Sequence, residues 1–144
     1  MLSILVGSVN LSKIIGREKN NLIRQTYYPY NRRHGPSSTL NANIHDLKKW
    51  GDAHINREVM TPGMYDMMWE TLTTVQNNGE GMGLGWFIRE QEGHIFYGHE
   101  GMDDGFRASF WICPELKFQI VVLANISKAP VKKISKTLTG FLGL

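Results

Sequence analysis

The second half of the chain alternates between apolar runs and short turn-forming clusters. From residue 83 to residue 124 the apolar runs are rich in aromatic and β-branched side chains, a pattern that predicts successive antiparallel strands. The expected strands cover residues 83–88, 94–97, 106–112 and 118–123, with tight turns at residues 91–93 and 114–115. The last strand has no polar residue between Val121 and Ala124, which predicts that both of its faces are buried.

Helical periodicity appears before and after these strands. Asn43 is a good N-cap residue with Asp46 in the first turn, and it opens a segment in which apolar positions recur at helical spacing, with Trp50 beside the stripe. These inward-facing positions are Ile44, Leu47, Gly51 and Ile55. Two histidines of this helix, His45 and His54, are interpreted as surface or packing residues and not as ligands.

A second helix is expected to begin at Thr61–Pro62, with threonine as the N-cap and proline at the first helical position. Its apolar side chains are Met64, Met67, Met68 and Leu72. They are interpreted as core residues, and an adaptable methionine-rich binding surface is the alternative.

A third helix is expected after Pro130. Its apolar stripe consists of Val131, Ile134, Leu138, Phe141 and Leu142. Together these patterns predict an α+β fold: an antiparallel sheet of about four strands, this helix packed on one face, and two or three preceding helices.

Composition is that of one ordinary globular domain, with 144 residues, 42% hydrophobic content and a formal charge of +3. Four lysines near the C-terminus are interpreted as a solvated helix face and not as a nucleic-acid patch; they are Lys128, Lys132, Lys133 and Lys136. Cys113 is the single cysteine and precedes Pro114, so we expect a buried, inert thiol and no internal disulfide.

Residues 1–25 are the least interpretable part, and we expect a poorly defined segment followed by one domain from residue 26 to residue 144. Residues 1–6 are apolar, but they are too few and lack the basic flank of a signal peptide. Leu11, Ile14 and Ile15 suggest a helical turn or two. No transmembrane segment is expected, and the cellular location stays open.

The stretch Gly98-His99-Glu100-Gly101-Met102-Asp103-Asp104-Gly105 is glycine-rich, acidic and carries a histidine. A histidine at a strand edge can point its ring at a substrate, and the glycine two residues later lets a ligand approach the backbone. A metal site formed by His99, Asp103 and Asp104 is disfavoured, because carboxylates in a glycine-flanked loop usually form turns. No cofactor is expected.

The order and spacing of several short motifs resembles one family. Gly-Leu-Gly-Trp at residues 83–86 is followed by Gly-His-Glu-Gly, Asp-Gly-Phe-Arg-Ala-Ser-Phe and Ile-Val-Val-Leu-Ala-Asn, and Gly-Pro-Ser-Ser-Thr-Leu precedes an Asp-Leu helix upstream. From about Tyr28 to the C-terminus the chain resembles the serine β-lactamase and penicillin-binding-protein-like hydrolases. The likeness is greatest to their class C β-lactamase, DD-peptidase and esterase branch.

In that family a Ser-x-x-Lys motif supplies the nucleophile, a Tyr-x-Asn or Ser-x-Asn motif transfers a proton, and a Lys-Thr-Gly or His-x-Gly strand binds substrate. The resemblance places the third element at His99, Glu100 and Gly101, with the backbone N–H of Met102 as an oxyanion donor. It also implies a β-lactam, D-Ala-D-Ala peptide or ester substrate and an exported protein, although no leader is visible.

The first element is absent, because no serine in this sequence has a lysine three residues later. Ser8-Val9-Asn10 has the form of the second element, but it lies closer to His99 than the family's order allows and is interpreted as a chance tripeptide. Tyr28 and Tyr30 precede a proline-containing loop, where they either line a groove or pack on a core edge.

Two hypotheses follow. In the first, the chain is the C-terminal portion of a family hydrolase that retains the substrate strand, lacks the nucleophile and is inactive alone. A small-molecule or peptidoglycan-like substrate would then bind only after completion by the missing half. In the second, it is a non-catalytic ligand- or protein-binding module. A fragment would expose a sheet edge and self-associate, whereas a finished module would be monodisperse.

Overall fold

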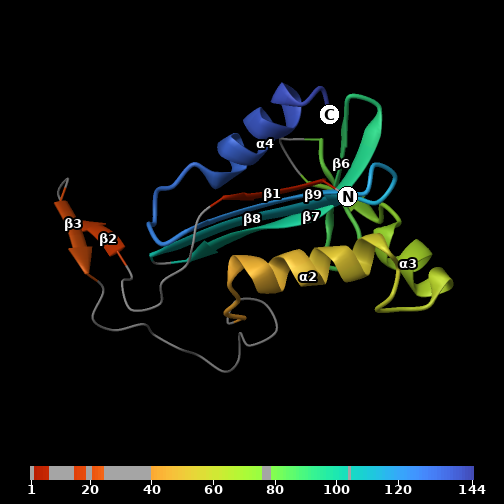
Figure 1. The fold of residues 1–144 in the computed structure, drawn as a ribbon, viewed down its shortest axis with the longest axis horizontal. Coiled ribbons are helices and arrows are strands. Elements are labelled where there is room, and N and C mark those ends of the chain that lie inside the picture. Colours follow the sequence, from red (N-terminus) through yellow and green to blue (C-terminus); the bar gives the residue numbers. More distant parts are fainter. Residues whose placement is uncertain (1, 7–14, 19–20, 25–39, 76–78, 104) are drawn as a thin grey trace.

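The computed structural model describes residues 2–6, 15–18, 21–24, 40–75, 79–103 and 105–144. One sheet of seven strands carries helices on both of its faces (Figure 1). The strands lie in the order β1 (Leu2–Val6), β9 (Phe118–Ala124), β8 (Phe106–Cys113), β7 (His94–Asp103), β6 (Phe87–Gln91), β5 (Gly81–Met82) and β4 (Thr73–Thr74). Only β1 is parallel to its neighbour.

The α+β class is confirmed, and the four expected strands correspond to the central strands β6 to β9. The sheet is wider than expected because β1, β5 and β4 extend it. Residues 83–86 are a turn and not a strand, with the Gly83 N–H donating to the Trp86 carbonyl at 2.9 Å. Strand β7 continues past Tyr97 as far as Asp103.

In its described part, the N-terminal segment contains three strands, β1 and the pair β2 (Ile15–Glu18) and β3 (Asn21–Arg24). Ile15 begins β2, which pairs with β3 in a separate hairpin, so the helical turn expected there is wrong. Leu11 and Ile14 lie outside the described residues. The apolar run at residues 2–6 forms β1, because continuous apolar runs of this length favour a strand.

Two cores lie on opposite faces of the sheet. Helix α2 (Ile44–Ile55) and helix α3 (Pro62–Trp69) cover one face, and helix α4 (Val131–Phe141) covers the other (Figure 1). Val121 and Leu123 belong to the α2 core, whereas Val122 belongs to the α4 core. The prediction that β9 is buried on both faces is therefore confirmed, and Cys113 is buried as expected.

Helix α2 begins as the sequence predicts. The Asn43 side chain accepts hydrogen bonds from the backbone N–H groups of His45 and Asp46 at 2.9 and 3.1 Å, and Asp46 reciprocates. Gly51 faces the sheet, where an added Cβ would lie 2.3 Å from Oε1 of Gln119. The glycine therefore allows the helix to approach the sheet closely.

The assignment of Met64, Met67, Met68 and Leu72 to the core is wrong for all but Met68. Met64 and Met67 are 51% and 63% exposed, and Leu72 follows the end of the helix with 56% exposure. The helix instead buries Met68 together with Tyr65 and Trp69. The two aromatic rings lie four residues apart with centroids at 4.8 Å, and they offer more apolar area to bury than the methionines do.

The predicted apolar stripe of α4 also needs a correction at its end, where Phe141 is 89% and Leu142 is 45% exposed. The row buried deepest against the sheet is Val131, Ser135 and Thr139, at a spacing of four residues. Phe141 follows Thr139 by two residues, which is about 200° around a helix, so its side chain points away from the sheet.

Candidate functional site

One edge of β7 is open beside the expected substrate motif. Strand β7 pairs with β8 from Tyr97 to Asp103, but its pairing with β6 stops at Gly98. In the described part of the chain, residues 99–103 therefore have a strand on one side only. An unpaired strand edge presents N–H and C=O groups that bind an extended ligand.

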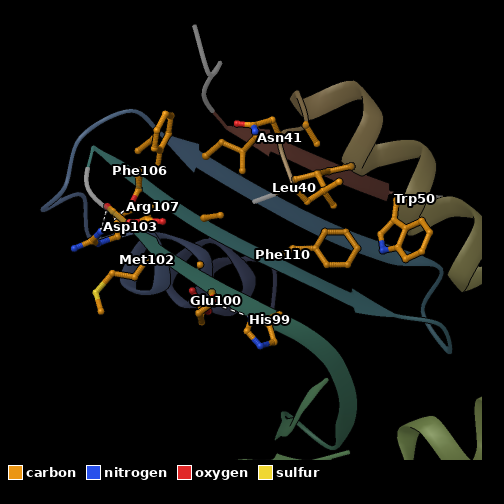
Figure 2. Close-up of a pocket in the computed structure, with 16 residues that line it drawn as sticks. Leu40, Asn41, Trp50, His99, Glu100, Met102, Asp103, Phe106, Arg107 and Phe110 are labelled. Carbon is orange, nitrogen blue, oxygen red and sulfur yellow. Dashed lines mark hydrogen bonds between the residues drawn. The ribbon is translucent and has the colours of Figure 1, made fainter. Parts of the chain in front are cut away.

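A cleft of about 630 Å³ lies beside this edge, between α2 and the sheet (Figure 2). Its wall is mostly apolar and is built from three parts of the chain: Leu40 before α2, Trp50 on α2, and Phe110 on β8. The polar side chains of its lining include Asn41 and Arg107. A concave apolar site with few polar groups is typical of small-molecule binding.

His99 stands at the start of the open edge. Its ring is stacked on Phe87, with centroids 4.6 Å apart and planes 17° apart. Its Nδ1 lies 2.8 Å from the carbonyl oxygen of Glu100 (Figure 2). The side chain is exposed and contributes to the lining of the cleft.

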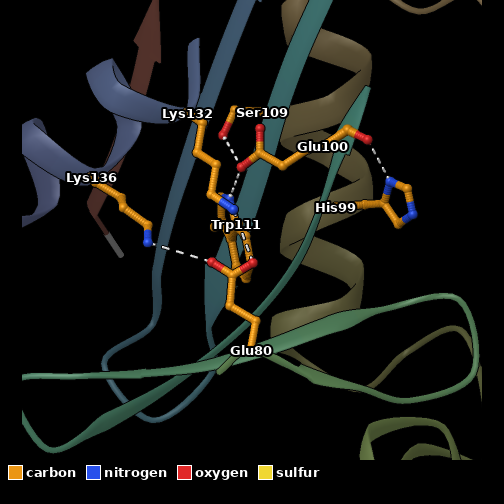
Figure 3. Close-up of polar contacts among 7 residues, drawn as sticks. All are labelled: Glu80, His99, Glu100, Ser109, Trp111, Lys132 and Lys136. Atoms are coloured by element: carbon orange, nitrogen blue, oxygen red, sulfur yellow. Dashed lines mark hydrogen bonds and ion pairs between the residues drawn. The ribbon is translucent and has the colours of Figure 1, made fainter. Parts of the chain in front are cut away.

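The Glu100 side chain points to the opposite face of the sheet, under α4. Its Oε1 accepts hydrogen bonds from Oγ of Ser109 at 3.0 Å and from Nε1 of Trp111 at 2.8 Å (Figure 3). Burial raises the pKa of this carboxyl group, and the two hydrogen bonds oppose the rise, as do the charges of Lys132 and Arg89. The middle residue of the motif is thus a structural anchor.

A second carboxylate, Glu80, lies under α4 beside this anchor. Lys132 reaches it at 2.9 Å and Lys136 at 3.4 Å, while Glu80 itself is only 4% exposed (Figure 3). The side chains of Lys132 and Lys136 are 40% and 48% exposed, as a solvated helix face predicts, but they also pair with a buried carboxylate that the sequence did not indicate. Their spacing of four residues places both on one face of α4, a signal that they share one partner.

Arg89 is a third charged residue on this face of the sheet, together with Glu100 and Glu80. The sequence did not indicate this residue. It is 6% exposed, and none of its three side-chain nitrogens has a hydrogen-bond partner among the described residues. Its Cζ lies 4.0 Å from the ring centroid of Trp111, a cation–π contact. Burial lowers its pKa, and the charges of Glu80 and Glu100 counteract this.

The remaining candidates are placed as follows. Met102 lies on the open edge with its side chain 79% exposed, and an added Cβ at Gly101 would meet the Ala108 Cβ at 3.2 Å. Nη1 of Arg107 donates to the carbonyl oxygens of Asp103 and Phe106 where β7 turns into β8. Ser8, Asn10, Tyr28, Tyr30 and Asp104 lie outside the described residues.

His54 supports the wall of the cleft, as the expected packing histidine. It is fully buried, with Trp50 on one side at 4.3 Å between ring centroids and Trp86 at 5.0 Å. In the part of the chain that the structure describes, neither ring nitrogen has a hydrogen-bond partner. Burial lowers the pKa of this histidine, because a charged ring would lose its hydration.

We expect the free energy of unfolding to fall as the pH drops below 6.5, the ordinary pKa of the His54 side chain. The unfolded chain then binds a proton that the folded chain resists, which lowers stability by up to about 1.4 kcal/mol per pH unit. Urea denaturation at several pH values measures this slope. His54→Phe keeps a ring in the aromatic cluster, and its slope should be shallower by one proton; an unchanged slope would assign the effect elsewhere.

Comparison with known proteins agrees with this fold. The family described as Beta-lactamase matches residues 13–141. An octameric penicillin-binding protein homologue from Pyrococcus abyssi has the same fold over 96% of this chain, with a TM-score of 0.71 and 23% identity. A penicillin binding protein from Bacillus halodurans matches 67% of this chain, with a TM-score of 0.59 and 20% identity.

An unguisins hydrolase from Aspergillus campestris (strain IBT 28561) is 29% identical over 91 residues, or 58% of this chain. The molecule is an α+β domain with an open strand edge beside an apolar cleft. Because the family match covers most of its length, this chain belongs to the beta-lactamase family. It spans 17% of the fungal hydrolase and 30% of each solved chain. None of the described helices is long and apolar enough to cross a membrane.

Proposed function

We propose that this chain supplies the substrate-binding part of a serine-hydrolase site. The observation that carries the proposal is the open edge at residues 99–103, which borders an apolar cleft. An acyl substrate would lie along this edge, with the Met102 N–H as a donor to the developing oxyanion. The substrate class is a β-lactam, a D-Ala-D-Ala peptide of the peptidoglycan type, or an ester.

The nucleophile would come from a Ser-x-x-Lys segment that this sequence does not contain. Ser109 on β8 and Ser135 on α4 are both buried, and the Ser127 hydroxyl accepts the Gly105 N–H. None of these three serines lines the cleft. Substrate binding without a nucleophile gives only residual catalysis. We therefore propose that the chain alone has no hydrolase turnover.

The alternative is a non-catalytic module that binds a ligand or a protein in the same cleft. Exposed apolar side chains fit both the first proposal and this alternative, because Leu40, Met102 and Phe141 are each more than three-quarters exposed. Apolar side chains this exposed are typically covered by further chain or by a partner. Self-association through the open sheet edge is the corresponding proposal for the isolated chain.

Intact-mass analysis tests the proposal directly. The folded chain is incubated separately with benzylpenicillin and with a fluorophosphonate, and we expect no covalent adduct with either. A stoichiometric adduct mapped to a serine of this chain would overturn the proposal that the nucleophile lies elsewhere. An intact serine β-lactamase treated in parallel is the positive control, and circular dichroism establishes that the chain is folded.

A further inference from the structure

The hydrogen bond made by the His99 ring determines which of its nitrogens carries a proton. Nδ1 lies 2.8 Å from the carbonyl oxygen of Glu100. A carbonyl oxygen only accepts hydrogen bonds, so Nδ1 must be the donor. Neutral imidazole has one N–H, and Nε2 therefore carries the free lone pair.

The ring is also held in place. Stacking on Phe87 at 4.6 Å restrains its rotation, and the backbone bond restrains its other side. His99 lies at the rim of the cleft and at the first position of the open edge (Figure 2). Both restraints act before any ligand is bound, so the lone pair is preorganised at this edge.

No fixed cation stands at this end of the cleft among the described residues. The cleft-lining residues in that part of the chain include a single arginine or lysine, Arg107, which lies three pairing positions from the level of His99 along β8. Its Nη1 is already bonded to two carbonyl oxygens. Among the described residues, a carboxylate placed beside the neutral His99 ring would therefore meet the Nε2 lone pair with no other side-chain charge to neutralise it.

We infer that His99 uses Nε2 as a hydrogen-bond acceptor, so that the site takes a substrate carrying an uncharged N–H or O–H group at this end and disfavours a carboxylate there. This inference rests on the proposed function, because it assigns the substrate class of the same edge. It makes His99 a specificity residue that selects amides or hydroxyl-bearing esters over acids.

The tautomer is measured first, on the folded, 15N-labelled chain at about pH 8.5, above the range in which histidines ordinarily titrate. Long-range proton–nitrogen correlation spectra distinguish a protonated ring nitrogen from an unprotonated one. We expect Nδ1 of His99 to be protonated and Nε2 to be unprotonated. The opposite pattern would overturn the inference, whatever binds in the cleft.

Ligand preference is measured next by NMR titration with two matched probes, N-acetylglycine N-methylamide and N-acetylglycine. We expect the amide to shift the N–H resonances of residues 99–103 and to bind about fivefold more tightly than the acid, the effect of one ordinary hydrogen bond. His99→Lys should reverse the preference, because it places a cation and only donors at that point. His45→Lys adds the same charge on the exposed side of α2 and should leave the preference unchanged.

The outcomes separate the two proposals. Binding at residues 99–103 with a preference for the acid, or with no reversal in His99→Lys, overturns the inference and leaves the substrate edge intact. Failure of both probes to shift these resonances overturns the assignment of this edge as a substrate site, and the inference falls with it.

Discussion

Gly98→Ala is expected to lower the free energy of unfolding by about 3 kcal/mol, near the upper end of the range for overpacked sites. A Cβ at this position would lie 2.2 Å from the Phe110 carbonyl oxygen and 2.5 Å from Cδ2 of Trp111. The first contact is with backbone in the middle of the sheet, and the second is with a fully buried indole. Neither group can move without disturbing the pairing of β7 with β8.

The reason for this crowding also links Gly98 to the site. The glycine leaves room for the Trp111 ring to lie against β7, where its Nε1 reaches the Glu100 carboxylate at 2.8 Å. Displacing the ring should therefore weaken the anchor of strand β7. In NMR spectra of Gly98→Ala, we expect the indole N–H resonance of Trp111 to shift more than those of the other tryptophans.

Urea denaturation followed by tryptophan fluorescence measures the loss. Gly63→Ala is the matched control, since an added Cβ there meets nothing within 4 Å and alanine favours a helix. Its stability should equal or slightly exceed that of the unmodified chain. A Gly98→Ala chain with unchanged stability would show that the sheet accommodates the methyl group, and the proposed role of the glycine would be wrong.

Local sequence signals predicted the strands of the central sheet because the tight turns that join them depend on neighbouring residues. The turn at Glu92 and Gly93 has positive φ values of 49° and 77°, which a glycine in the turn signals directly. The same signals failed at residues 83–86, where glycines alternate with the apolar residues Leu84 and Trp86. Gly83 is needed there because a Cβ would lie 2.3 Å from the Met68 carbonyl oxygen of α3, a contact that the local sequence does not reveal.

In the candidate site, too, the local sequence predicted individual residues but not the contacts between distant parts of the chain. The motif located His99 and Glu100 beside each other, but it did not show that their side chains point to opposite faces of the sheet. The charged residues near Glu100 under α4 come from distant parts of the chain. Lys132 and Glu80, for example, form an ion pair although they are 52 residues apart. Periodicity reports burial along one element, and it carries no information about which elements meet.

Glu100→Ala is expected to lower the free energy of unfolding by about 2–4 kcal/mol. The substitution removes the acceptor of two hydrogen bonds, from Ser109 and Trp111, both of which are fully buried. Each buried donor left without a partner costs about 1–3 kcal/mol. The edge at residues 99–103 should lose order as well, which faster hydrogen exchange of the Gly101 and Met102 N–H groups would report.

Glu100→Gln separates the hydrogen bonds from the charge. Glutamine keeps an oxygen that accepts from both donors, so its stability at neutral pH should lie within about 1 kcal/mol of the original. Because burial raises the pKa of Glu100 above its ordinary 4.5, the folded chain holds its proton longer than the unfolded chain does. The stability contributed by this group is therefore full below pH 4.5 and is lost as the pH rises through the folded-state pKa.

The glutamine variant should lack this pH-dependent component. The stability of the original chain relative to Glu100→Gln should thus decrease between pH 4 and neutral pH, while Glu100→Ala stays less stable than both. Equal losses in the alanine and glutamine variants would show that the charge, through its attraction to Arg89 and Lys132, matters more than the two hydrogen bonds. In that case the Glu100 carboxylate would hold strand β7 in place by balancing the positive charge of the buried Arg89 side chain.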